Sequence, residues 1–134
     1  MKTIIQRALI LVSIVLLASC SGYGDKEVFN GTEVFYKGEI TKDEVNKLGN
    51  YLISSEFADG RGKSVQLVKN EENGNYVFRM VTNEKAQKEK IYEYSFKALA
   101  MQISDSVFSG EPVDFDICNN TFESVKYIPF KTSK

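Results

Sequence analysis

Two aspartates near the carboxyl end of the chain are the first residues whose spacing suggests chemistry. Asp114 and Asp116 alternate with apolar residues in the run 113–117, a pattern typical of a strand, so both carboxylates project from one face. Such a pair can share a divalent cation, but a calcium site takes about 6–8 oxygen ligands and the sequence offers no others beside them. We therefore expect both aspartates to face water and to bind no metal.

Carboxylates can also serve as the acid and base of glycoside hydrolysis, provided that two of them lie at a set separation. The chain has 18 acidic residues, and their order along the sequence does not select a pair. A small carboxylate-dependent hydrolase therefore remains an alternative function.

Cys118 is the other candidate for covalent chemistry. A nucleophilic thiolate needs a group that activates it, and the chain has no histidine, the residue that most often serves as general base and as metal ligand. Cys118 follows directly on an alternating apolar run, so we expect it to pack as a small, weakly polar side chain. These residues predict that the protein is not an enzyme and binds no cofactor.

The first twenty residues have the layout of a secretory signal peptide. Lys2 and Arg7 accompany an apolar run that is shorter than the roughly 20 residues of a membrane-crossing helix. The run ends in Leu17-Ala18-Ser19-Cys20, which resembles the lipobox of bacterial lipoproteins. An ordinary secreted protein and an uncleaved signal anchor are the alternatives.

This resemblance implies that residues 1–19 are a lipoprotein signal peptide and that Cys20, acylated with chains such as palmitate, is the first mature residue. It implies a membrane-anchored lipoprotein of the bacterial cell envelope. Ser21 follows the cysteine, which in that family favours the outer membrane if the host has one. Residues 20–25 are mostly small and polar, so we expect them to form a short tether. The mature domain resembles the small uncharacterised lipoproteins of bacteria.

The charge of the mature chain is nearly balanced. Without Lys2 and Arg7, 15 of the 17 basic residues remain against 18 acidic ones, and the two signs are interspersed. Nucleic-acid binding leaves a basic patch or stripe, and the sequence has none. We therefore expect no nucleic-acid partner.

Residues 26–134 are expected to form a single globular α+β domain. Asn-Gly pairs at 30–31 and 73–74 lie between strand-like runs, which indicates two hairpins. Further strands are predicted at 113–117 and 122–128, so the order is β-β-α-β-β-α-β-β. Because each helix has one apolar stripe to bury, we expect an antiparallel or mixed sheet with both helices on one face. The core of this arrangement resembles a ferredoxin-like sandwich.

Two amphipathic helices are predicted between these strands. The first begins at Lys42, after a capping box formed by Thr41 and Glu44, and its apolar stripe contains Val45, Leu48 and Leu52. The polar segment 83–90 leads into the second and longer helix. Its stripe contains Tyr92, Phe96, Leu99 and Ile103, widened by Ala98, Ala100 and Val107.

Aromatic residues make up 12% of the chain, and the run 77–81 is apolar on both faces of its strand. The sheet face without helices is therefore expected to carry a partly apolar patch, which is typical of a partner surface. Arg79, Asp114 and Asp116 are the candidate residues of that face. We expect a lipid-anchored, non-catalytic binding or interaction module whose partner is a protein or an envelope polymer. An inhibitor or immunity-type lipoprotein against a toxin or hydrolase and a small envelope hydrolase are the alternatives.

Overall fold

An Asn-Gly turn shapes the first hairpin of the fold. The computed structural model describes residues 22–131, so the lipobox and Cys20 lie outside the described residues. Asn30 and Gly31 both have positive φ, 44° and 85°, as the tightest right-twisted hairpin turn requires. They join strand β1 (Asp25–Phe29) to strand β2 (Thr32–Tyr36) in an antiparallel pair. This hairpin is confirmed as the sequence predicts it.

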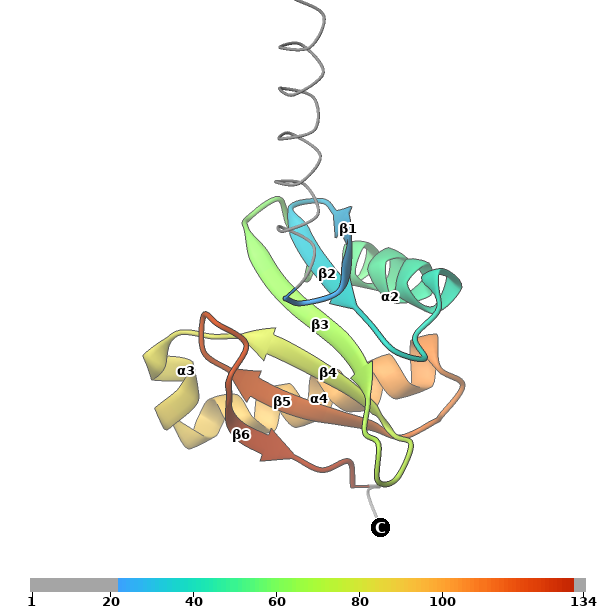
Figure 1. The fold of residues 1–134 in the computed structure, drawn as a ribbon. Coiled ribbons are helices and arrows are strands. Elements are labelled where there is room, and N and C mark those ends of the chain that lie inside the picture. The colour runs from blue at the N-terminus through green and yellow to red at the C-terminus, as the bar shows by residue number, and fades with distance from the viewer. Residues whose placement is uncertain (1–21, 132–134) are drawn as a thin grey trace, which may run out of the picture.

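The other elements follow in an order that alternates hairpins with helical crossovers (Figure 1). In chain order they are α2 (Lys42–Ser54), β3 (Lys63–Lys69), β4 (Tyr76–Val81), α3 (Glu84–Lys88), α4 (Lys90–Val107), β5 (Val113–Cys118) and β6 (Ser124–Ile128).

The six strands form one mixed sheet in which they lie in chain order from β1 to β6. Hairpins pair β1 with β2, β3 with β4 and β5 with β6 antiparallel. The crossover through α2 makes β2 and β3 parallel, and the crossover through α3 and α4 makes β4 and β5 parallel. The expected α+β class with a mixed sheet is therefore confirmed.

The ferredoxin-like order is not confirmed. In that fold the βαβ units are split, so another strand separates the two parallel strands, whereas here each parallel pair is directly hydrogen-bonded. The hairpins explain this order, because β1 already occupies one edge of β2 when the chain crosses over. Only the opposite edge is free to pair with β3, and the same holds for β4 and β5.

A short helix also interrupts the segment that the sequence predicts only as a polar lead. Helix α3 begins after Asn83, whose side-chain oxygen accepts a hydrogen bond of 2.9 Å from the backbone N–H of Ala86. It has no buried residue, so it has no apolar periodicity from which it could be predicted.

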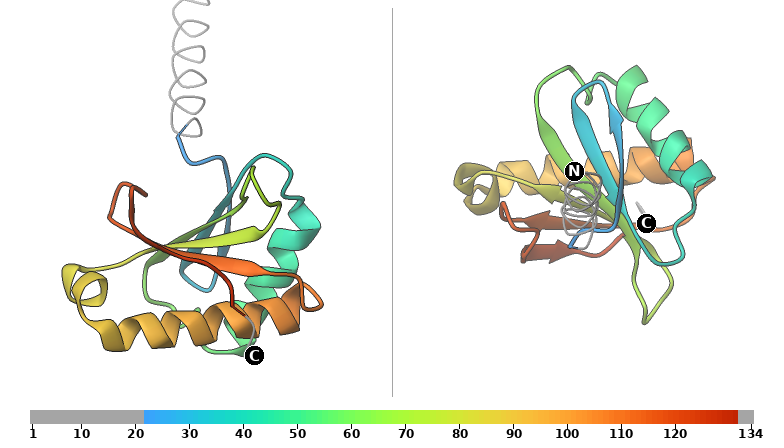
Figure 2. Two further views of the ribbon diagram at one scale, coloured as in Figure 1. Left: turned by 90° about the horizontal axis from the view of Figure 1, so that it is seen from below. Right: turned by 45° about the horizontal axis from the view of Figure 1, so that its top comes forward.

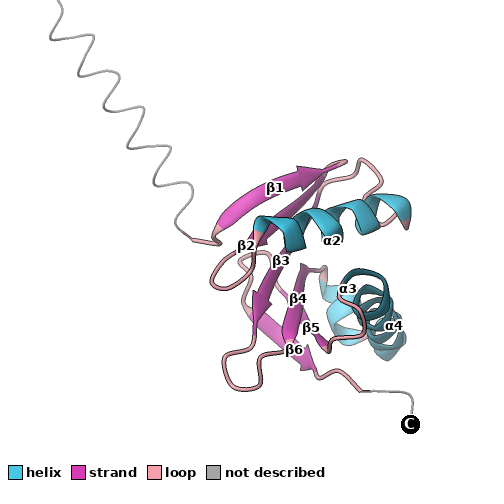
Figure 3. Ribbon diagram, turned by 90° about the vertical axis from the view of Figure 1, so that its right-hand side faces the viewer, coloured by secondary structure: helices cyan, strands magenta, loops and turns pink. Residues whose placement is uncertain are grey.

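The helices lie on one face of the sheet, as Figure 3 shows from the side. In the left view of Figure 2, α4 runs along the strands and α2 lies near its carboxyl end. Tyr51 of α2 donates a hydrogen bond from its hydroxyl to the side-chain oxygen of Gln102 of α4. None of the helices within residues 22–131 has the length and apolar character needed to cross a membrane.

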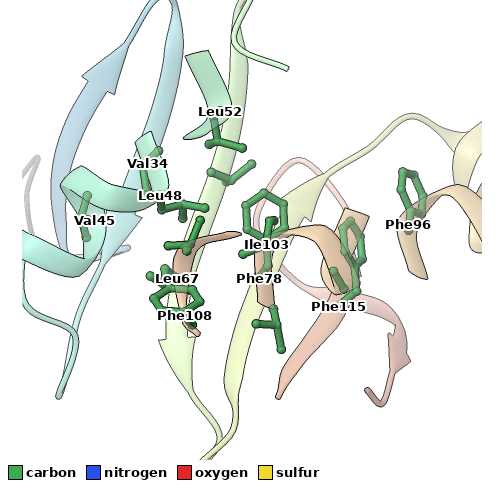
Figure 4. Packing of buried hydrophobic residues seen from close by; sticks show 14 of the residues in the cluster. Val34, Val45, Leu48, Leu52, Leu67, Phe78, Phe96, Ile103, Phe108 and Phe115 are labelled. Carbon is green, nitrogen blue, oxygen red and sulfur yellow. The ribbon is translucent and has the colours of Figure 1, made fainter. Parts of the chain in front are cut away.

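The main core lies between this helix layer and the sheet (Figure 4). Val45, Leu48 and Leu52 of α2 are fully buried, as their spacing predicts. From the other helix, Phe96 stacks on Phe115 of β5 with ring centroids 4.7 Å apart. Phe78 of β4 lies between the two halves of this core. The core therefore fixes which strand residues point to the opposite, helix-free face.

Candidate functional site

One row of side chains crosses the helix-free face at the same level on every strand. The strand register places these residues side by side, and each alternates with neighbours that face the helix layer. We call this set the central row; from β1 to β6 it contains Lys26, Phe35, Gln66, Arg79, Asp116 and Tyr127.

An ion pair occupies the middle of the central row. Arg79 donates from Nε to Oδ2 of Asp116 at 2.9 Å. Its two terminal nitrogens donate to the side-chain oxygen of Gln66 and, at 2.6 Å, to the carbonyl oxygen of Phe122. Ser124 donates to the other oxygen of Asp116. The guanidinium and the carboxylate therefore satisfy each other and their neighbours, as a buried pair must.

Asp114, which precedes Asp116 by two residues on β5, forms a second polar cluster. Its carboxylate accepts hydrogen bonds from the Tyr127 hydroxyl at 2.5 Å, the Asn75 side chain at 3.3 Å and the backbone N–H of Phe130 at 2.8 Å. Burial, followed by this bond to Asp114, raises the pKa of Tyr127 to about 12. The hydroxyl therefore remains protonated and donates at neutral pH.

The expectation that both aspartates face water is wrong. Asp114 is 1% exposed and Asp116 is 4% exposed, because β6 and the segments that flank it cover this part of the helix-free face. All four carboxylate oxygens already accept hydrogen bonds. Among residues 22–131 no group of three or more potential acidic, cysteine or histidine ligands is placed to hold a metal ion. Arg79 and Asp116 thus belong to one internal network and Asp114 to another, both under the face that the sequence predicts to bind a partner.

Cys118 lies in the same layer and is completely buried. Burial and then the nearby Asp116 charge raise the pKa of its thiol to about 11. The thiol is therefore protonated at neutral pH, whereas a nucleophile must be a thiolate. This environment supports the packing role that the sequence predicts.

The start of the described chain covers the centre of the row. Gln66 donates from Nε2 to the carbonyl oxygen of Tyr23 at 2.9 Å. The Tyr23 ring contacts Phe35 and Phe122, with centroid distances of 5.4 and 4.9 Å. Part of the segment expected to be a free tether is therefore docked on the domain. Gln66 is not among the site residues that the sequence predicts, because its only signal is a polar residue between two apolar strand residues.

Helix α4 has a second apolar stripe on its exposed side, and the last residue of this stripe, Met101, also lines a cavity beside Val113 of β5 and Ile128 of β6. Ile91 is 66% exposed, Tyr94 is 62% exposed and Met101 is 36% exposed. Ala98 is exposed as well, so its predicted place in the buried stripe is wrong. Residues spaced by three and four positions lie along one helix face. We call these four residues the outer stripe.

A cavity of about 550 Å³ lies between the loop before α2 and the β3–β4 loop. Its lining brings together Lys37 and Lys69 with Glu39 and Glu71, so its charges are balanced and do not favour a ligand of either sign. The lining residues outside β3 belong to loops, and one of them, Asn70, donates a hydrogen bond of 3.1 Å to the Tyr127 hydroxyl of the Asp114 cluster.

The amino-acid sequence of the domain matches one family model. Residues 26–128 match the AF_1994_N model, described as a family N-terminal domain. No curated protein and no solved structure matches the chain significantly.

Proposed function

We propose that this chain, which belongs to the AF_1994_N family of N-terminal domains, is a lipid-anchored binding module of the bacterial cell envelope. In this proposal Cys20 carries the lipid, and the domain binds a protein partner without performing catalysis. The anchor is supported by the lipobox-like residues Leu17 to Cys20. Two or more acyl chains give stable attachment where one is marginal.

The outer stripe of α4 carries the binding proposal. Soluble domains rarely leave several large apolar side chains contiguous and exposed unless another molecule covers them. Ile91, Tyr94 and Met101 are exposed on the same helix. Tyrosine and methionine are enriched in the centres of protein interfaces. These residues favour a protein over a polysaccharide, whose hydroxyls need hydrogen-bonding partners.

The polar networks support a binding role over a catalytic one. Arg79 and Asp116 satisfy each other, and the Asp114 carboxylate accepts three hydrogen bonds. A catalytic carboxylate must instead reach the proton that it transfers to or from a substrate. Arg79, Asp114 and Asp116 therefore use their polar groups in contacts that hold the sheet together.

Crosslinked affinity capture from the envelope of the host tests this function. The full lipidated protein is compared with a double variant, Ile91→Ser and Tyr94→Ser, and with the control Val125→Ser. Val125 is an apolar side chain on β6 that is 48% exposed. We expect one stoichiometric protein partner with the wild type and the control, and its loss with the double variant.

The alternative outcomes of the capture are decisive. A partner retained by the double variant contradicts the outer stripe as the binding surface. Recovery of a cell-wall polymer in place of a protein contradicts the class of partner. Hydrolysis of cell-wall fragments that disappears on replacement of a single aspartate or glutamate would replace the proposal with the hydrolase alternative.

The anchor is tested separately with Cys20→Ala. We expect the variant to lose acyl labelling and to accumulate as an unprocessed precursor, measured by metabolic labelling and mass spectrometry. A mature product without lipid would instead indicate an ordinary secreted protein.

A further inference from the structure

The docked start of the chain lies on the side of the sheet opposite the helices. Tyr23 is held by Gln66 and by the rings of Phe35 and Phe122, all of which lie on or against the helix-free face. Figure 3 shows the described chain beginning on the left of the sheet, with all helices on the right. The chain therefore approaches the domain from the helix-free side.

Cys20 is only three residues before Tyr23. A fully extended chain spans at most about 3.6 Å per residue, so the two Cα atoms are no more than about 11 Å apart. We propose that the helix-free face of the sheet lies against the surface of the bilayer and that the helix layer faces away from it. This inference rests on the proposed acylation of Cys20.

The short distance leaves no room for a folded protein domain between Tyr23 and the bilayer. A folded domain of 100 residues has a radius of gyration of about 13 Å, which exceeds the largest separation of about 11 Å that the chain allows. The lipid surface is then the occupant of this face. Ile91 and Tyr94 of the outer stripe are exposed on the helix layer and stay accessible to a partner.

The chemistry of the helix-free face suits contact with lipid headgroups. Its exposed side chains include Val28 at 57%, Tyr127 at 39% and Tyr23 at 36%. Tyrosine is enriched at membrane–water interfaces, and Tyr23 is suited to that position, whereas the Tyr127 hydroxyl is already bonded to Asp114 and Asn70. The charges of Arg79 and Asp116 are already paired beneath this surface. The Arg79–Asp116 pair therefore needs no counter-charge from the headgroups.

Fluorescence quenching in vesicles tests this orientation with one reporter on each side of the domain. The chain contains no tryptophan, so a single introduced tryptophan reports alone. Val28 lies on the helix-free face, because successive strand residues point to opposite faces and its neighbour Phe29 packs against Gly49 of α2. The first reporter is therefore Val28→Trp. The second reporter is Ile91→Trp; Ile91 lies on α4 and is 66% exposed, similar to Val28. Both lipidated variants are bound to phosphatidylcholine vesicles that contain a headgroup nitroxide label.

We expect a loss of fluorescence for Val28→Trp and unchanged fluorescence for Ile91→Trp. Equal quenching, or stronger quenching of Ile91→Trp, overturns the orientation. Flotation with the vesicles is measured on the same samples, and far-ultraviolet circular dichroism checks that both variants are folded. Protein that does not float contradicts the anchor, whereas floating protein with the wrong quenching pattern contradicts the orientation alone.

A longer tether tests the cause of the orientation. An insertion of about ten glycine and serine residues between Ser21 and Gly22 adds a reach of roughly 18 Å. We expect this insertion in the Val28→Trp variant to restore much of the lost fluorescence. Undiminished quenching would show that the short tether does not set the orientation.

Discussion

Gln66 connects the start of the described chain to the ion pair at the centre of the sheet. Its Nε2 donates to the carbonyl oxygen of Tyr23 at 2.9 Å, and its Oε1 accepts from Arg79. Arg79 in turn pairs with Asp116. The segment next to the proposed lipid site and the Arg79–Asp116 ion pair therefore belong to one hydrogen-bonded network.

Asp116→Ala should strongly destabilise the domain. Arg79 and Asp116 have side-chain exposures of only 19% and 5%, so removal of the carboxylate leaves a largely buried guanidinium without its counter-charge. We expect a loss of about 3 kcal/mol in the free energy of unfolding, measured with urea. Glu84→Ala is the control, because the Glu84–Lys88 pair is exposed and such pairs contribute little. Equal effects of the two substitutions would contradict a structural role for the buried pair.

Cys118 should make stability depend on pH in the alkaline range. Burial and then the Asp116 charge raise the pKa of its thiol from 9.0 to about 11. The folded state therefore retains the proton more tightly than the unfolded chain. This contribution is fully present below about pH 9 and is lost as the pH rises toward about 11.

The free energy of unfolding of the wild type should therefore fall more steeply over this range than that of Cys118→Ala. The difference between the two proteins isolates the thiol, because Tyr76 and Tyr127, whose pKa values are also raised to about 12, are present in both. Parallel curves would contradict the assignment to Cys118.

Thr41→Ala should destabilise the start of α2. The Thr41 hydroxyl accepts from the Glu44 backbone N–H at 3.2 Å, and the Glu44 carboxylate accepts from the Thr41 N–H at 2.8 Å. Loss of such a cap costs about 1 kcal/mol. Thr41→Ser retains the hydroxyl and should keep most of the stability in urea unfolding. A serine variant as unstable as the alanine variant would show that the methyl group, rather than the cap, matters.

Glu44 should make the free energy of unfolding depend on pH in the acid range. Burial raises the pKa of its carboxyl group, but hydrogen bonds from the Tyr76 hydroxyl and from Thr41 outweigh that effect and hold the pKa below 4.5. Its contribution is therefore present above about pH 4.5 and is lost as the pH falls through the lowered value. Glu44→Gln should reduce the acid dependence of unfolding, which a urea titration at several pH values measures.

Gly49→Ala should destabilise α2 although alanine is the better helix former. A Cβ atom at this position would overlap the ring of Phe29 on β1. We expect overpacking to cost about 1–3 kcal/mol and the better helix propensity to offset about 1 kcal/mol of that cost, so the net loss is up to about 2 kcal/mol. Gly62→Ala has open space around its Cβ and should be nearly neutral. A stabilised Gly49→Ala variant would show that the helix can move away from β1 at no cost.

Local signals in the sequence predicted most of the elements correctly. The Asn30-Gly31 turn and the capping box at Thr41 both have the expected geometry, because each depends on the backbone of a few consecutive residues. The apolar stripe of α2 is buried as expected. Helix α3 was missed because it buries no side chain.

The surroundings of the strands could not be predicted in the same way. Alternation placed Asp114 and Asp116 correctly on the face opposite Phe115, yet both are buried. A period of two residues identifies the two faces of a strand but does not indicate what covers each face. Here the cover includes Phe122, Ser124, Tyr127 and Phe130.

The turns, the helix start and the strand alternation follow directly from the amino-acid sequence, because each is encoded in a few neighbouring residues, and the lipobox-like signal is equally local. The order of the strands, the pairing of Arg79 with Asp116 and the docking of Tyr23 were evident only in the folded chain. The hydrogen bond from Gln66 to Tyr23 joins residues 43 positions apart. Such contacts depend on which surfaces meet when the whole chain packs, and no local pattern carries that information.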